Sequence, residues 1–498
     1  MKRRLSLIAV AVLLVTLLVV ASTFAQGGFP DPGTSETNAV VQNKATGAGE
    51  LATLAVDYYD QAGSLVYTNS SVTIDPKAVA EIKTQNEPLP SGFQGSAVIS
   101  SDRPLASIVS IKNTSVPGAP DGLTQGAYNG TSAAATELYF PTVWGFSGIA
   151  SRVTVMNAEG SAASVDFDFY DRTGAYLGQT TQTLAGFAAT TIYMGGPGDL
   201  PSGWPAGFQD GSITASSSNL LAGASTATWT NRSGAYQSLT ANNQGTVLFA
   251  PSHFRFANPG TPAGEFDLFS AVNIQNTSDS TTANVTVEYY TRGDVSGVPA
   301  LTVPTTIAPL SARGLNTKNG GDLPASTFDP LGTDWDGSVK IISNNAVELV
   351  GTGITHWGTT GKSGIYALVS ANDGSNIIYV PAQYRLMSSQ WNQWSAINLQ
   401  NIGGSTIAAA DLSIEYIDTA GNTVATFSGT DLPGNLASGA ALGLNTRNGG
   451  DLSASDFDSF GNSFIGGIYV TAPAGSELVG VANIIYANRA SVYNGDPG

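Results

Sequence analysis

Carboxylate side chains gather in two related segments of the second half of the chain. Residues 314–322 read Gly-Leu-Asn-Thr-Lys-Asn-Gly-Gly-Asp, and residues 443–451 repeat eight of these nine. Turn-rich loops with several oxygen ligands are what calcium prefers. The carboxylates that the two segments and the residues after them supply are Asp322, Asp329, Asp334, Asp336, Asp451, Asp456 and Asp458. These seven residues are candidate calcium ligands, and a bound calcium ion would stiffen the loops.

The same segments have a simpler interpretation. Asn-Gly-Gly-Asp forms tight turns without a metal, because Asn and Asp side chains hydrogen-bond to nearby backbone and glycine accepts a positive φ. The spacing of the acids also differs from the Asp-x-Asp-x-Asp-Gly loop that is typical of calcium sites. We favour the turn interpretation, and calcium is the only cofactor that the sequence suggests.

Tryptophan supplies the second candidate chemistry. Trp335 shares a repeated column with Phe93, Phe208 and Phe464, so we expect it in a core. Trp391 and Trp394 lie close together at the start of the last quarter of the chain. A flat indole that is exposed can stack on a sugar ring. These two residues are therefore candidates for sugar binding.

Catalytic chemistry is poorly represented. The chain has no cysteine and two histidines, His253 and His356, neither of which recurs in a repeated column. A nucleophilic triad normally uses histidine as its base, and thiolate zinc sites need cysteine. No HExxH, GxSxG, phosphate-loop or dinucleotide glycine pattern is present. We predict a protein that is not an enzyme, with both histidines in packing or surface positions.

The elements that carry these residues repeat along the chain. Residues 165–171 read Val-Asp-Phe-Asp-Phe-Tyr-Asp, and similar phrases stand at residues 54–60, 285–291 and 412–418. The aromatic residues at the fifth position of the phrase are Tyr58, Phe169, Tyr289 and Tyr416, at spacings of 111, 120 and 127 residues. A period this long corresponds to a whole domain and not to a solenoid turn.

We therefore predict four repeats, called modules 1 to 4 below: residues 26–135, 136–245, 246–375 and 376–498. Apolar and polar residues alternate within the phrase, which is typical of a half-buried antiparallel strand. An Asp-x-x-Gly turn follows it in three of the four copies. About seven such short strands per module predict an all-β protein of four tandem immunoglobulin-like antiparallel β-sandwich domains. Short linkers between them predict a rod or a zigzag.

The N-terminal segment has the pattern of a signal peptide. Three basic residues, Lys2 to Arg4, precede an almost wholly apolar run from Leu5 to Ala21, and Thr23-Phe24-Ala25 offers a cleavage site. We expect residues 1–25 to be removed, which leaves no membrane span in the mature chain. Loss of the three basic residues takes the formal charge from −17 to −20. A chain this acidic is not expected to bind nucleic acid.

The columns Val-x-x-Gln-Asn, Tyr-Tyr-Asp-x-x-Gly and Gly-Phe-x-Gly-Ser-Ala-Val resemble those of tandem immunoglobulin-like repeat proteins of bacterial cell surfaces. The resemblance implies a secreted or surface protein with a structural or adhesive role, and no shared active site. Its partners would be components of the cell envelope or matrix. Two alternatives are a carbohydrate-binding array with glycans as ligands, and a subunit that self-assembles into a filament or surface layer.

Overall fold

The structure, a computed structural model, describes residues 11–15, 33–146, 148–196, 199–204, 210–257, 266–294, 296–358, 361–388 and 391–498. Antiparallel strands dominate, so the predicted all-β class is confirmed. No helix within these ranges is long and apolar enough to cross a membrane. The predicted cleavage site at Thr23 to Ala25 lies outside the described residues.

The strands divide among the four predicted ranges, except that β1 precedes them and β9 begins at Ala135. Module 1 carries β2 (Thr34–Asn43), β3 (Ala52–Asp60), β4 (Leu65–Ile74), β5 (Val79–Lys83), β6 (Gly95–Ser101), β7 (Leu105–Thr114) and β8 (Thr124–Asn129), and β1 (Ala11–Val15) joins its sheet. Module 2 carries β9 (Ala135–Phe146), β10 (Ile149–Asn157), β11 (Ala163–Asp171), β12 (Tyr176–Leu184), β13 (Ala189–Tyr193), β14 (Asp210–Trp229) and β15 (Arg232–Gln237).

Modules 3 and 4 each add short strand pieces to the same plan. Module 3 carries β16 (Val247–Phe256), β17 (Leu268–Asn276), β18 (Ala283–Thr291), β19 (Leu301–Ile307), β20 (Ala312–Asn316), β21 (Gly320–Gly321), β22 (Asp334–Ser343), β23 (Leu349–Trp357), β24 (Lys362–Ala367) and β25 (Val369–Ser370). Module 4 carries β26 (Ile377–Met387), β27 (Trp391–Asn401), β28 (Ser413–Asp418), β29 (Thr423–Ser428), β30 (Ala441–Asn445), β31 (Gly449–Gly450), β32 (Ser463–Thr471), β33 (Leu478–Tyr486), β34 (Ala490–Asn494) and β35 (Asp496–Pro497). The described 3-10 turns are η1 (Thr84–Asn86), η2 (Pro120–Gly122), η3 (Ala241–Asn243), η4 (Ala325–Leu331), η5 (Ala371–Asp373), η6 (Ala409–Asp411), η7 (Gly429–Asp431) and η8 (Ala454–Phe460).

The repeated phrase forms the strands β3, β11, β18 and β28, and its alternation is the reason. In β11, Val165, Phe167 and Phe169 are fully buried while the residues between them are partly exposed. The turn that follows is also as predicted: the Gly174 N–H donates to the Asp171 carbonyl at 3.0 Å, and Gly174 has φ +86°. The phrase therefore sets a core-facing strand and the hairpin after it.

Each module is a sandwich of two packed layers, which are separate sheets in module 1 and parts of one continuous sheet in modules 2, 3 and 4. In module 1 their strand orders are β1-β6-β3-β4 and β5-β2-β7-β8, and both sheets supply side chains to one core. In module 2 the long strand β14 runs through both layers. An immunoglobulin domain places its first strand beside the second, in a sheet with the fifth and fourth, whereas here the first strand lies beside the sixth. The sandwich is as predicted, with a strand order of its own.

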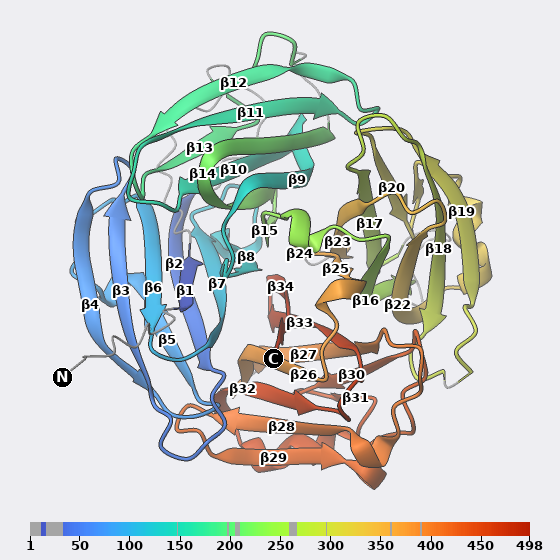
Figure 1. The fold of residues 1–498 in the computed structure, drawn as a ribbon. Helices are drawn as coiled ribbons and strands as arrows, with labels where there is room; N and C mark the ends of the chain where they lie inside the picture. The colour runs from blue at the N-terminus through green and yellow to red at the C-terminus, as the bar shows by residue number, and fades with distance from the viewer. Residues whose placement is uncertain are drawn as a thin grey trace, which may run out of the picture.

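The four modules form a closed ring, so the predicted rod or zigzag is wrong (Figure 1). The strands β8, β15, β24 and β34, which are the last strands longer than two residues in their modules, meet at the centre, and each packs against the corresponding strands of the two neighbouring modules. We call these four strands the hub. Contacts between modules 4 and 1 close the circle, as when the Tyr379 hydroxyl donates to the Lys44 carbonyl at 2.7 Å.

The Asp-x-x-Gly turn explains part of this closure. Its glycine packs against the backbone of the next module, so closely that a Cβ at Gly63 or Gly174 would overlap the carbonyl oxygen of Gly186 or Pro309. At the closing interface a Cβ at Gly421 would lie 3.0 Å from the Pro76 carbonyl oxygen. The contact that joins module 4 to module 1 is thus of the same kind as the contacts that join module 1 to module 2 and module 2 to module 3.

Candidate binding site at the ring axis

The hub strands share a sequence column that anchors them. Tyr128, Tyr236, Tyr366 and Tyr493 stand at the same place in the four strands and are buried. The hydroxyls of Tyr236, Tyr366 and Tyr493 donate to backbone carbonyls of the first strand of their own module, at 2.7, 2.8 and 2.7 Å. Burial raises the pKa of all three phenols well above the ordinary value. Each tyrosine therefore remains a neutral donor that fixes the last strand to the first.

Glycine lets the hub strands approach one another. A Cβ at Gly126 would lie 3.0 Å from the Ala235 nitrogen, and a Cβ at Gly234 would lie 2.6 Å from Cγ1 of Ile365. A Cβ at Gly364 would overlap the Val492 side chain. Each contact joins one module to the next, so these glycines fix how closely the four last strands pack at the axis.

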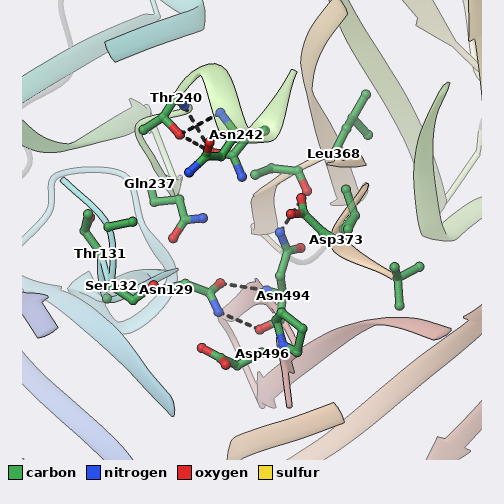
Figure 2. A pocket seen from close by; sticks show the side chains of 18 of the residues that line it. Asn129, Thr131, Ser132, Gln237, Thr240, Asn242, Leu368, Asp373, Asn494 and Asp496 are labelled. Atoms are coloured by element: carbon green, nitrogen blue, oxygen red, sulfur yellow. Dashed lines mark hydrogen bonds between the residues drawn. The ribbon is translucent and has the colours of Figure 1, made fainter. Parts of the chain in front are cut away.

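A cavity of about 220 Å³ opens at the end of the hub where the last strands finish (Figure 2). Residues from all four modules line it. Its polar lining includes Asn129, Thr131, Ser132, Gln237, Asn242, Asn243, Asp373, Asn494 and Asp496. It is smaller than the common range for small-molecule sites, about 300–1,000 Å³. It therefore suits one small polar unit or the end of a longer molecule.

Two of the lining asparagines are held in place by each other. The Asn129 side-chain amide donates to the Asn494 carbonyl at 2.7 Å, and the Asn494 N–H donates to Oδ1 of Asn129 at 2.9 Å (Figure 2). The Asn494 amide also donates to the Ala367 carbonyl at 3.0 Å. This network links modules 1, 3 and 4 along one wall, which therefore has a defined geometry.

The opposite wall is a capped turn that follows the hub strand of module 2. Thr240 caps η3: its hydroxyl accepts the Asn242 N–H at 3.3 Å, and Oδ1 of Asn243 accepts the Thr240 N–H at 3.0 Å. Asn242 itself is exposed and faces the cavity (Figure 2). The turn thus presents an amide whose hydrogen-bonding groups are accessible to a ligand.

Two carboxylates, those of Asp373 and Asp496, line the cavity in different environments. Burial raises the pKa of Asp373 above its ordinary value. Burial also raises the pKa of Asp496, although the Lys44 ammonium, 2.7 Å away, opposes this shift. Amides, hydroxyls and two carboxylates favour a polar ligand that donates hydrogen bonds over an anionic one.

The calcium candidates lie elsewhere and have other partners. Asp322 accepts the Gly314 N–H at 2.7 Å, and Asp451 accepts the Gly443 N–H at 2.6 Å. Each also pairs with an arginine of the preceding module: Asp322 with Arg172 at 2.7 Å and Asp451 with Arg292 at 3.0 Å. These are the ends of inter-module ion pairs.

The remaining five candidates do not converge either. Asp329 and Asp458 pair with buried arginines of their own module, Arg255 and Arg385, at 3.1 and 3.0 Å. Asp336 pairs with Arg292 at 2.7 Å; burial raises its pKa to about 6 although the arginine opposes this. Asp456 accepts the Ser453 N–H at the start of η8, and Asp334 is exposed. Within the described residues no group of three or more His, Cys, Asp or Glu could hold a metal ion. The geometry therefore does not support calcium in these loops.

The prediction that tryptophan stacks on a sugar is wrong for Trp394 and stays a prediction for Trp391. Trp394 is 7 % exposed, and the Arg447 guanidinium covers its ring at 4.5 Å from the centroid. It therefore offers no free face to a sugar. Trp391 begins β27 opposite Met387, but its side chain lies outside the described part of the structure.

Both histidines pack among aromatic rings, as predicted. His253 is fully buried, with its ring centroid 5.8 Å from that of Tyr289. His356 lies 5.3 Å from Trp229. Burial lowers the pKa of each imidazole to about 3. Neither histidine lines the axial cavity.

The sequence contains a signal for the axial site that the repeated strand phrase does not include. A tyrosine followed by an amide residue recurs as Tyr128-Asn129, Tyr236-Gln237 and Tyr493-Asn494. This repeat is only two residues long, so it stands out less in the sequence than the seven-residue phrase of the core-facing strand. No protein-family model matches the chain, and no curated protein matches it. Function must therefore be inferred from this geometry.

Proposed function

We propose that the chain is an exported, non-enzymatic structural or adhesive protein of the cell envelope or extracellular matrix, built as a rigid ring with a binding site on its axis. The observation that carries the proposal is the convergence of all four hub strands on one polar cavity. Repeated contacts close the ring and hold the lining residues of the cavity in fixed positions. A site positioned by rigid elements loses little conformational entropy on binding.

The chemistry of the cavity supports binding more than catalysis. Its described lining has no histidine, and the recurrent acids of the chain are engaged in ion pairs and turns. Asp373 and Asp496 therefore have no histidine in that lining to serve with them as the base of a nucleophilic triad. Their role in the proposal is to accept hydrogen bonds from a ligand.

A saccharide is the second part of the proposal, because one observation favours it. The cavity combines side-chain amides and hydroxyls with the apolar residues Val369 and Pro497, neither of which is buried. Sugar hydroxyls donate to and accept from amides and carboxylates, and the C–H faces of a sugar pack on aliphatic surface. In this proposal the glycan binds at the axis and not at Trp394, whose ring Arg447 covers.

The experiment is a binding assay with isolated envelope material and a glycan array. The matched variants are Asn242→Trp, which fills the mouth of the cavity, and Asn462→Trp, which adds the same side chain at an exposed site in module 4. We expect the first variant to lose at least about tenfold in affinity, equivalent to about 1.4 kcal/mol, and the second to bind as the unaltered chain does. Equal binding by both variants, or no binding by the unaltered chain to any preparation, would show the proposal to be wrong.

A further inference from the structure

Module 1 obtains its first strand from an unexpected part of the chain. In modules 2, 3 and 4, the strand beside β14, β22 and β32 is the first strand of the module itself: β9, β16 and β26. In module 1 the strand beside β6 is β1 (Ala11–Val15), from the apolar run of the predicted signal peptide (Figure 1). The leader segment therefore stands where the other modules have a permanent strand.

The register of β1 matches that of the other three first strands. Gly95, Gly211, Gly337 and Gly466 mark the same position in the partner strands, because each lies opposite the end of the repeated phrase. Four residues beyond each glycine the pairs are Leu13–Ile99, Leu138–Ala215, Leu248–Ile341 and Ile378–Val470. The three first-strand residues in modules 2 to 4 are buried. The leader thus carries a branched aliphatic residue where the fold requires one.

The connection from β1 to the next strand is also of normal length. Eighteen residues lie between Val15 and the start of β2 at Thr34, and seventeen lie between the equivalent Ala250 and the start of β17 at Leu268. Cleavage after Ala25 would leave only the eight residues 26–33 before β2. In the shortest connection, in module 2, ten residues lie between Leu138, which is equivalent to Leu13, and the start of β10 at Ile149. The shortened N-terminus is therefore too short to reach the position opposite Ile99.

The first strand also belongs to an interface between modules. β9 packs on β17 and β23 of module 3, β16 on β27 and β33 of module 4, and β26 on β2 and β7 of module 1. By analogy with these three strands, we expect the strand beside β6 to lie next to module 2. The described contacts there are the stacked rings of Tyr59 and Phe187, 4.7 Å apart, and the packing of Val98 on Met156. An unfilled position would leave both a sheet edge and a module interface incomplete.

We propose that the free edge of β6 is a strand-acceptor site. Once residues 1–25 are removed, an extended apolar strand of another polypeptide occupies it, antiparallel to β6, with a branched aliphatic residue at the place of Leu13 and an apolar residue at the place of Val15, where the other modules have Phe140, Ala250 and Val380. An unpaired strand edge offers a row of N–H and C=O groups, and an added strand satisfies them while its alternate side chains enter the core. We infer the side chains of the occupant from those that the four strands carry at the same register positions. The inference does not depend on the axial site.

The test uses the full chain with a protease site in place of residues 23–25, so that β1 is released only after folding. A fluorescent peptide of residues 8–17 is then added, and its uptake is followed by polarisation. We expect uptake by the cut chain and not by the uncut chain. The matched peptides are Leu13→Glu and Val12→Glu. The Val12 position corresponds in register to Glu137 of module 2, which is exposed, and the Leu13 position to Leu138, which is buried, so a glutamate at the latter position would place a charge in the core.

We expect Val12→Glu to bind like the parent peptide and Leu13→Glu to bind at least about tenfold more weakly. Equal binding of the two, or no uptake by the cut chain, would overturn the proposal. Hydrogen exchange supplies a second measurement. The amides of residues 97–101 should exchange faster once β1 has been washed away and slow again with peptide, while amides of β22 in module 3 report that the ring remains folded. Unchanged protection without any peptide would show that the chain closes the edge itself.

Discussion

Arg172 of module 2 and Asp322 of module 3 form an ion pair across the interface between these modules, with 2.7 Å between Nη2 and Oδ2. Arg172 also pairs with Asp210 of its own module. The same arrangement joins module 3 to module 4, where Arg292 contacts Asp336 and Asp451. The loops whose carboxylates suggested calcium are therefore the places where the preceding module docks.

This relationship accounts for where the Asn-Gly-Gly-Asp loops occur. The residue after the repeated phrase is arginine only in modules 2 and 3, and it is Gln61 in module 1 and Thr419 in module 4. A loop with the acceptor aspartate stands only in the modules that follow an arginine, which are modules 3 and 4. The loop and the arginine are two halves of one inter-module contact.

The first prediction concerns this contact. Arg172→Met leaves Asp322 and Asp210 without their cation, and we expect it to lower the free energy of unfolding by about 1 kcal/mol, since the guanidinium pairs with both carboxylates and is partly buried. Urea denaturation measures the change. Lys112→Met is the control, because its pair with Glu36 is more exposed and lies within one module. We expect less than about 0.5 kcal/mol there. An equal loss in the two variants would argue against a special role for Arg172.

The second prediction concerns metal removal. Because Asp322 and Asp451 are already paired with arginines and backbone N–H groups, we expect neither millimolar calcium nor a chelator to shift the melting temperature by more than about 1 °C, since a ligand stabilises only as far as it binds the native state. Differential scanning calorimetry in the two conditions makes the comparison. A clear rise with calcium that is lost in Asp322→Asn would restore the calcium hypothesis.

The third prediction concerns acid stability. His253 is buried, neither ring nitrogen has a hydrogen-bond partner in the described structure, and its pKa is lowered to about 3. The unfolded chain takes up a proton below pH 6.5 and the folded chain does not, so stability is lost as the pH falls from 6.5 toward 3. Module 4 has Gln383 at the same place, where its amide donates to the Tyr493 hydroxyl at 3.3 Å.

We therefore expect His253→Gln to retain stability at pH 7 and to exceed the unaltered chain in free energy of unfolding by about 2.7 kcal/mol at pH 4.5, as two pKa units of linkage imply. Urea midpoints at the two pH values test this. His356 retains its own acid sensitivity, so the variant still weakens with acid, but less steeply. An identical pH profile for the two proteins would mean that His253 is not the source of the loss.

The fourth prediction concerns the hub. Gly364→Ala places a methyl group against Val492, and we expect it to cost about 1–3 kcal/mol, as overpacking in a core does. Val492→Ala removes the methyl groups that the new side chain meets. The double variant should therefore be less destabilised than the sum of the two single variants. Strict additivity in this double-mutant cycle would indicate that the two strands do not touch at this point.

Much of each module was predictable from local pattern. The alternation around Phe167 and Phe169 identified a core-facing strand, and Asp171 to Gly174 identified its turn, because both depend on residues close in sequence. Trp335 was correctly expected in the core, at 4 % exposure. Short-range periodicity is sufficient for features of this kind.

The ring and the axial cavity were not predictable in the same way. Alternation predicts that Tyr59 and Tyr290 face solvent, but Tyr59 stacks on Phe187 of the next module and Tyr290 lies against Gly439 of module 4. The hub depends on glycines such as Gly364, which leave no hydrophobic signal. Contacts between modules are made by backbone and by single residues more than a hundred positions apart, and no local period reports them.

Ring closure has a consequence for the order of events during biosynthesis. The contacts that join module 4 to module 1 bridge up to 452 residues, as between Asp496 and Lys44. At a synthesis rate of about 5–20 residues per second, module 1 waits about 20–90 s for its last neighbour. Since the four interfaces resemble one another, an open chain at high concentration can accept a module from a second chain instead. Correct closure of the ring therefore depends on each polypeptide being completed before it meets another unfinished one. At high concentration, chains whose rings are still open would exchange modules and form interlocked multimers.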